Sequence, residues 1–169
     1  MTTSITTDLP NDVRLLLSAS ITDVFATMFE MEAKSAAVQN LRANGELVVA
    51  GSVGFVGAAN GMVYIFFGAG FAQELADRFL GSDEPGSSSE EMVNDVVGEL
   101  SNMVVGGVKS QLCDLGFSCV LTIPSVMRGR NLSAVPIHRV DQQIMGFRCG
   151  AGYILVELQL KPVQETSKI

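Results

Sequence analysis

The chain has 169 residues, of which 47% are hydrophobic and 17% are charged, and its formal net charge is −7 at pH 7. This balance argues against a disordered chain and predicts a single domain over residues 1–169, with an ordered core at about residues 10–162 between polar tails. The negative charge argues against a nucleic-acid-binding protein, which needs a basic surface to neutralise phosphates.

The first half of the chain predicts a helix, a β-hairpin and a second, shorter helix. Residues 1–10 lack the basic start and the apolar run of a signal peptide. After them, Asn11 and Asp12 can cap a helix, and the apolar residues that follow recur with a helical period. In chain order we expect a helix over 12–33, a loop over 40–45, strands over 46–56 and 62–67 joined by a turn at Ala58, Asn60 and Gly61, and a helix over 69–80.

The second half predicts a longer helix followed by strands. Ser88 and Glu91 match the S-x-x-E capping box at the head of a helix, and Gly116 can adopt the positive φ that ends one. We expect a helix over 88–115, a strand over 118–123 ending at Pro124, a loop over 125–133, no assigned element over 134–140, and strands over 142–148 and 153–160. The apolar side of the long helix consists of Val93, Val96, Val97, Leu100, Val104 and Leu115.

These elements predict an α+β fold in which two long helices pack on an antiparallel sheet, because sequential hairpins favour antiparallel pairing. A long helix followed by a pair of strands occurs twice, which indicates an internal duplication, although the two halves share little residue identity.

The cysteines and the absence of long apolar runs indicate the cell compartment. Cys113, Cys119 and Cys149 are odd in number and have no C-x-x-C spacing, so they predict neither a disulfide framework nor a zinc site. The sequence has no run of about 18 uninterrupted apolar residues, which is the length that a membrane-spanning helix needs. We therefore expect a cytoplasmic protein whose cysteines are reduced, buried and act as small hydrophobes.

The polar side of the long helix is the most informative feature of the sequence. Asp95, Glu99, Asn102 and Gly106 follow one another at spacings of four, three and four residues, so they stack along one side of the helix. This side carries two carboxylates and an amide but no activated nucleophile. It suits a surface that inserts polar groups into another protein's active site. If only the spacing is considered, an ordinary solvated helix face is an equally good explanation.

The wider pattern resembles a known family. The chain reads D-x3-E-x2-N-x3-G from Asp95, and Pro124 follows Asn102 by 22 residues. Together with Leu115-Gly116 and the segments PSV at 124–126 and GRNL at 129–132, this pattern resembles the CheC/CheX/FliY family of bacterial chemotaxis phosphatases. The resemblance is closest to the CheX branch and covers about residues 12–160.

The resemblance implies a function, namely hydrolysis of the aspartyl phosphate on a CheY-type response regulator that carries Mg²⁺. It implies that Asn102 enters the regulator's active site and orients the attacking water, and that Glu99 pairs with the regulator's lysine. Asp95, Met103 and Gly106 would belong to the partner-binding surface. An amide does not titrate near neutral pH, so Asn102 can position water but cannot deprotonate it. We expect this chain itself to bind no metal or cofactor.

The first predicted helix lacks the motif. Aligning Asp23 with Asp95 places Thr27 and Glu30 at the positions of Glu99 and Asn102. The chain therefore resembles single-site CheX proteins, and that resemblance implies a homodimer. The alternative is a non-catalytic module that uses the same helix to hold a response regulator or a flagellar-switch component.

Several other residues have simpler interpretations. Arg128 and Arg130 could contact a phosphate, but we favour ordinary loop charges. His138 lacks a nucleophile partner, so we expect a structural or exposed histidine. The segment Gly68–Gly70 lacks the lysine and the spacing of a phosphate loop. Gly98 is expected at the edge of the polar side of the long helix, and Gly107 is expected to pack against a strand.

Overall fold

The computed structural model describes residues 9–39, 41, 45–136 and 139–161. Within these residues the chain forms three helices and seven strands. The helices are α1 (Leu9–Phe29), α2 (Ala69–Phe79) and α3 (Glu90–Asp114). The strands are β1 (Ala33–Ala36), β2 (Leu47–Gly57), β3 (Asn60–Gly68), β4 (Cys119–Leu121), β5 (Ser125–Arg130), β6 (Asp141–Cys149) and β7 (Gly152–Lys161).

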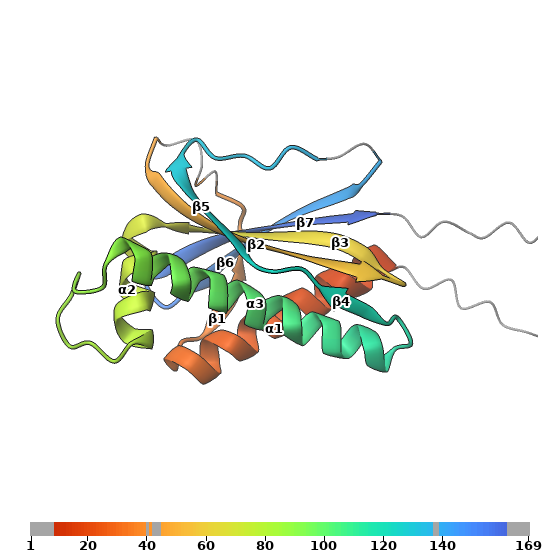
Figure 1. The fold of residues 1–169 in the computed structure, drawn as a ribbon, viewed down its shortest axis with the longest axis horizontal. Helices are drawn as coiled ribbons and strands as arrows, with labels where there is room; N and C mark the ends of the chain where they lie inside the picture. Colours follow the sequence, from red (N-terminus) through yellow and green to blue (C-terminus); the bar gives the residue numbers. More distant parts are fainter. Residues whose placement is uncertain (1–8, 40, 42–44, 137–138, 162–169) are drawn as a thin grey trace, which may run out of the picture.

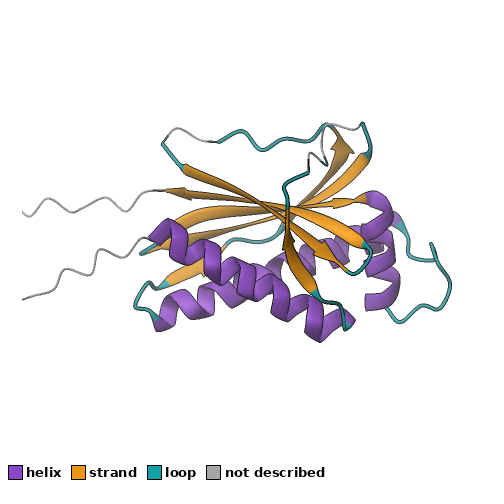
Figure 2. Ribbon diagram, turned by 180° about the vertical axis from the view of Figure 1, so that it is seen from behind, coloured by secondary structure: helices purple, strands orange, loops and turns teal. Residues whose placement is uncertain are grey.

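All strand pairs are antiparallel and form one twisted sheet in the order β1-β6-β7-β3-β2-β4, with β5 also paired to β2. The three helices cover the same face of this sheet, with α1 beside α3 and α2 at one end (Figures 1 and 2). The predicted α+β fold, with long helices on an antiparallel sheet, is confirmed.

The sheet order confirms the internal duplication. One half comprises α1 followed by β1, β2 and β3, and the other comprises α3 followed by β4, β6 and β7. In the sheet order, β1 of the first half corresponds to β4 of the second, β2 corresponds to β6, and β3 corresponds to β7. Corresponding strands stand at equal distances from the two ends of the sheet. Because β1 pairs with β6 and β4 pairs with β2, each half places its first strand beside the other half's hairpin. The two halves are therefore interlocked within one core.

The main core lies between the helices and the sheet. It includes Phe25 of α1, Leu100 of α3, Phe55 of β2 and Ile154 of β7, each at most 2% exposed. Full burial of such a side chain contributes about 1.5–3 kcal/mol. A smaller cluster lies on the other face, where Leu132 packs after the end of β5. Residues 153–160 are consequently buried without alternation, because both faces of β7 are covered.

Two element predictions are wrong: one element ends earlier than predicted, and another is a strand rather than a loop. The first helix ends at Phe29 rather than at Ala33, and Glu30 adopts a positive φ of 52°. The chain then forms β1, whose pairing with β6 is a tertiary contact that local periodicity does not reveal. The predicted loop over 125–133 contains strand β5, which pairs with β2 from Ser125 to Arg130.

The turn and cap predictions are close but shifted. The hairpin turns at Ala58 and Ala59, and the Asn60 side chain both accepts from the Gly57 N–H and donates to the Gly57 carbonyl oxygen, each at 3.1 Å. Ser89 rather than Ser88 caps α3, because its hydroxyl accepts from the Met92 N–H at 3.2 Å.

The end of α3 confirms one prediction and corrects another. Gly116 has a φ of +91°, as expected of the residue that ends the helix. Leu115 is 59% exposed rather than on the buried side, because it lies beyond the last helical turn.

The prediction of buried cysteines holds for Cys119 and Cys149 and is wrong for Cys113, which is exposed in the last turn of α3. All three are free thiols. Burial raises the pKa of the Cys149 thiol to about 12, so this residue acts as a small neutral hydrophobe. No helix among the described residues has both the length and the apolar character required to cross a membrane.

Candidate functional site

Helix α3 is held against the sheet by a close contact at its centre. Ser101 is 1% exposed, and its hydroxyl donates to the Val97 carbonyl oxygen at 2.8 Å. It lies directly over Gly51 of β2, where a Cβ atom would collide with the Ser101 side chain. Since the side chain at position 101 points into the sheet, residues 99 and 102 are turned outward. The contact thus fixes the rotation of the helix about its axis.

The motif face, defined as Asp95, Glu99, Asn102 and Gly106, points away from the core as predicted. Asp95 and Glu99 are exposed, whereas Asn102 and Gly106 are half-buried. Within the described part of the chain, no hydrogen bond or ion pair engages the side chains of Asp95, Glu99 or Asn102. Two carboxylates and an amide are therefore available to a partner without breaking an internal contact.

Met103 differs from the other predicted contact residues. Its side chain is half-buried and packs against the main core. Only part of its surface remains open beside the motif face.

The three glycines of α3 have different surroundings. A Cβ at Gly106 would meet no atom within 4 Å, so the fold itself does not require glycine there. A Cβ at Gly107 would collide with Ser20 of α1, so the predicted packing against a strand is wrong. A Cβ at Gly98 would lie 3.4 Å from Val126 and 3.9 Å from Pro124. Gly98 is therefore buried at the edge of the motif face, beneath Pro124 and the start of β5.

The two arginines of β5 are bound within the protein. Arg128 donates to Asn94 Oδ1 at 3.0 Å, and its Nε lies 3.6 Å from Glu90. Arg130 donates to the Gly45 carbonyl oxygen. The interpretation of Arg128 as an ordinary loop charge is therefore wrong: it ties β5 to the first turns of α3. The sequence did not predict this contact, because residues 125–133 were assigned to a loop rather than to a strand.

A groove that sequence reasoning missed borders the motif face. It encloses about 270 Å³ between α2 and α3, and two of its lining residues, Asp95 and Glu99, belong to the motif face. The remaining lining residues are Phe79, Leu80, Met92 and Val96. No periodic pattern reveals it, because the groove depends on how the end of α2 meets the start of α3.

A buried carboxylate holds this junction together. Asp77 accepts hydrogen bonds from the backbone N–H groups of Gly86 at 2.7 Å and Ser88 at 3.0 Å, and from Gln73 Nε2 at 3.2 Å. The Ser88 side chain, then the Gly86 N–H, lower the pKa of Asp77 to about 2. Asp77 therefore stays ionised and fixes the α2–α3 connection around its charge.

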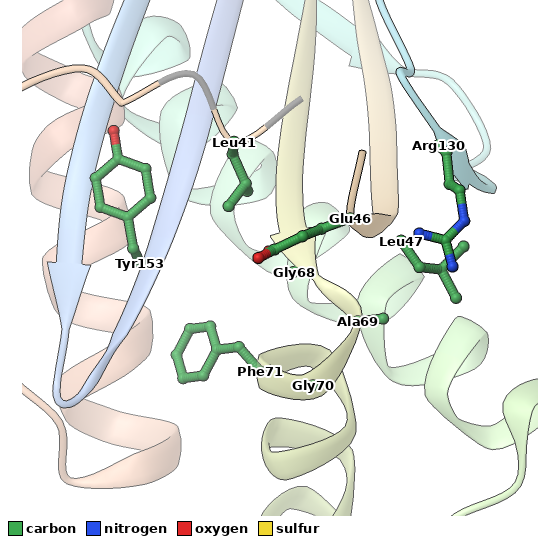
Figure 3. A pocket seen from close by; sticks show the side chains of 9 residues that line it. All are labelled: Leu41, Glu46, Leu47, Gly68, Ala69, Gly70, Phe71, Arg130 and Tyr153. Atoms are coloured by element: carbon green, nitrogen blue, oxygen red, sulfur yellow. The ribbon is translucent and has the colours of Figure 1, made fainter. Parts of the chain in front are cut away.

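A larger hollow, of about 480 Å³, lies elsewhere, where β3 leads into α2 (Figure 3). It is lined by residues 68–70, and its charged side chains are Glu46 and Arg130. No residue of the motif face reaches it. Among the residues that the structure describes, no group of three His, Cys, Asp or Glu side chains could hold a metal ion. His138 lies outside the described residues.

Comparison with protein families gives one match. The family model described as "Chemotaxis phosphatase CheX" matches residues 49–148, a range that includes most of β2 and all of β3, α2 and α3, and with α3 the motif face. No curated protein matches the chain.

Solved structures match over most of their length. The chemotaxis protein CheX from Vibrio vulnificus is 32% identical with a TM-score of 0.74, covering 89% of this chain and 97% of that one. A CheC-like superfamily protein from Shewanella sp. PV-4 is 30% identical with a TM-score of 0.75, and the match covers 89% of this chain and 98% of that one. The CheX of a CheX–CheY–BeF3–Mg²⁺ complex from Borrelia burgdorferi shares the fold, with 19% identity and a TM-score of 0.69. That match covers 89% of this chain and 99% of the other.

Proposed function

Because the chain belongs to the CheX family of chemotaxis phosphatases, we propose that it accelerates hydrolysis of the aspartyl phosphate on a CheY-type response regulator. The observation that carries this proposal is the outward, unpaired pair Glu99 and Asn102 on a helix whose rotation is fixed. A CheX from Borrelia burgdorferi has been solved bound to CheY, which supports the same class of partner for this chain.

In the proposed mechanism, Asn102 positions the attacking water. Its amide offers both donors and an acceptor and does not take up a proton near neutral pH, so it can orient a water molecule in line with the phosphorus. Orientation of this kind can lower a barrier by several kcal/mol, with ~7–11 kcal/mol as the upper range. The regulator supplies Mg²⁺ and the phosphorylated aspartate, so this chain contributes placement rather than covalent chemistry.

Glu99 would fix the docking by pairing with the regulator's active-site lysine. One helical turn separates it from Asn102, so a carboxylate held on the lysine places the amide beside the phosphoryl group. Asp95, Met103 and Gly106 would complete the contact surface, with Gly106 allowing the regulator's backbone to approach closely. We also propose a cytoplasmic location and a homodimer, in keeping with the family.

The test is the decay of phosphate from a panel of phosphorylated CheY-type receivers, with and without the protein. We expect faster decay of at least one receiver. Asn102→Ala should lower turnover by about 10²-fold or more, the usual cost of removing a positioned polar group from a reaction centre. Glu99→Ala should mainly raise KM, because it removes a docking contact.

The control is Gln111→Ala, which removes an exposed amide from the far end of α3 and should leave decay unchanged. Tight binding of receivers without faster decay would support the non-catalytic module instead. Full activity of Asn102→Ala would show that the water is positioned by another group.

A further inference from the structure

The groove beside the motif face has an apolar floor and an acidic wall. Val96 at its base is 4% exposed, whereas Leu80 and Met92 remain 45% and 42% exposed at its rim. Asp95 and Glu99 form the wall that the groove shares with the motif face. A partner that covers the motif face must therefore also lie over the groove.

The exposure of Leu80 and Met92 is not explained by the packing of this chain. Both are large apolar side chains in one hollow, and apolar surface in a concave site beside polar groups marks a contact surface. Leu80 caps the end of α2 and Met92 lies in the first turn of α3. The Asp77 network joins these two ends, so the hollow is preformed.

The charges around the groove favour a cation from outside. Asp95 and Glu99 are four residues apart on α3, a spacing at which like charges repel. The carboxyl end of α2 adds partial negative charge. Neighbouring cations are already engaged, since Arg78 pairs with Glu74 at 3.1 Å and Arg128 with Asn94.

We infer that the groove receives a large apolar side chain of the response regulator, flanked by a basic residue that pairs with Asp95. This inference rests on the proposed function, because it extends the same docked complex beyond Glu99 and Asn102. A second copy of this chain is a poor occupant, since it carries a net charge of −7 and the same acidic wall.

The test measures kcat and KM with a phosphorylated receiver that the wild-type protein dephosphorylates. Met92→Lys and Leu80→Ser should each raise KM about tenfold or more with little change in kcat, because they alter docking and leave Asn102 in place. Met127→Lys is the matched control: Met127 is 43% exposed on β5, away from the groove, and its substitution should leave KM unchanged. Urea unfolding checks that each variant is folded.

Salt dependence tests the basic residue separately. For wild type, KM should rise with ionic strength, and Asp95→Asn should flatten that rise because one ion pair is lost. If wild type dephosphorylates the receiver but both groove variants keep its KM, the inference is overturned while the proposed function stands. If no receiver is dephosphorylated, the proposed function itself fails.

Discussion

Single residues on α3 decide which chemistry faces outward. Ser101 and Asn102 are neighbours in the chain, yet the hydroxyl is buried over Gly51 and the amide is turned toward solvent. About 100° of helical rotation separates them. A larger residue at position 51 would displace α3 and tilt the amide away from its partner. The position of Asn102 therefore depends on a glycine in a strand of the other half of the fold.

Gly106 and Gly107 give a residue-level prediction. Gly106→Ala should raise the free energy of unfolding by about 0.5–1 kcal/mol, since alanine favours a helix interior and its Cβ meets open space. The same change should weaken receiver binding if the regulator's backbone approaches this glycine. Urea unfolding and a titration with receiver loaded with beryllofluoride and Mg²⁺ measure the two effects.

Gly107→Ala is the comparison, because its Cβ would collide with Ser20. It should lower the free energy of unfolding, in contrast to Gly106→Ala. Unchanged receiver affinity in Gly106→Ala would remove Gly106 from the contact surface.

At the scale of elements, the α2–α3 connection depends on an ionised Asp77. Its carboxylate accepts backbone hydrogen bonds from both Gly86 and Ser88, so one charge orders the loop and the start of α3. Leu80 and Met92, at the rim of the groove, lie on either side of this connection. Loss of the charge is expected to loosen the groove before it affects the sheet.

Asp77→Asn should lower the midpoint of thermal unfolding at pH 7. The folded-state pKa of Asp77, about 2, lies below its ordinary value of 3.8, so its stabilisation is present above pH 4 and is lost as pH falls toward 2. The difference in midpoint between wild type and variant should narrow over that interval. Asp83→Asn, in the same loop, serves as control, and a difference that does not change with pH would contradict the role of the charge.

An element could be predicted from the sequence where the residues that determine it lie close together in the chain. Helix α3 and the pairs β2–β3 and β6–β7 were predictable, because their apolar periods and turns lie within short segments. Strands β1 and β5 were not, since β1 exists through its pairing with β6, and β5 carries two arginines and a glycine that are typical of a loop. The motif face was predictable from spacing, whereas the groove required the tertiary junction set by Asp77.

At the scale of the molecule, the sheet ends at β4 in the strand order of the described residues. Val120 on this strand is 66% exposed, and its partner in register, Val56, is 53% exposed. An exposed apolar pair at the end of a sheet is a surface to which another sheet edge can add. This end of the sheet is our choice for the interface of the proposed homodimer.

Sedimentation equilibrium should give a dimer for wild type and a monomer for Val120→Lys, because a lysine on an edge strand opposes pairing. Leu15→Lys, which changes a 61% exposed residue of α1, should remain dimeric. A monomeric wild type would refute the dimer, and a dimeric Val120→Lys would move the interface elsewhere.

The place of β7 in the sheet also bears on how the chain is made in the cell. Residues 152–161 lie between β3 and β6, which come from opposite halves of the fold. During synthesis, neither hairpin can join the other until these residues leave the ribosome. A nascent chain therefore exposes the apolar faces of its helices and two incomplete sheets until residues 152–161 have been made, and chaperones are expected to bind it during that interval.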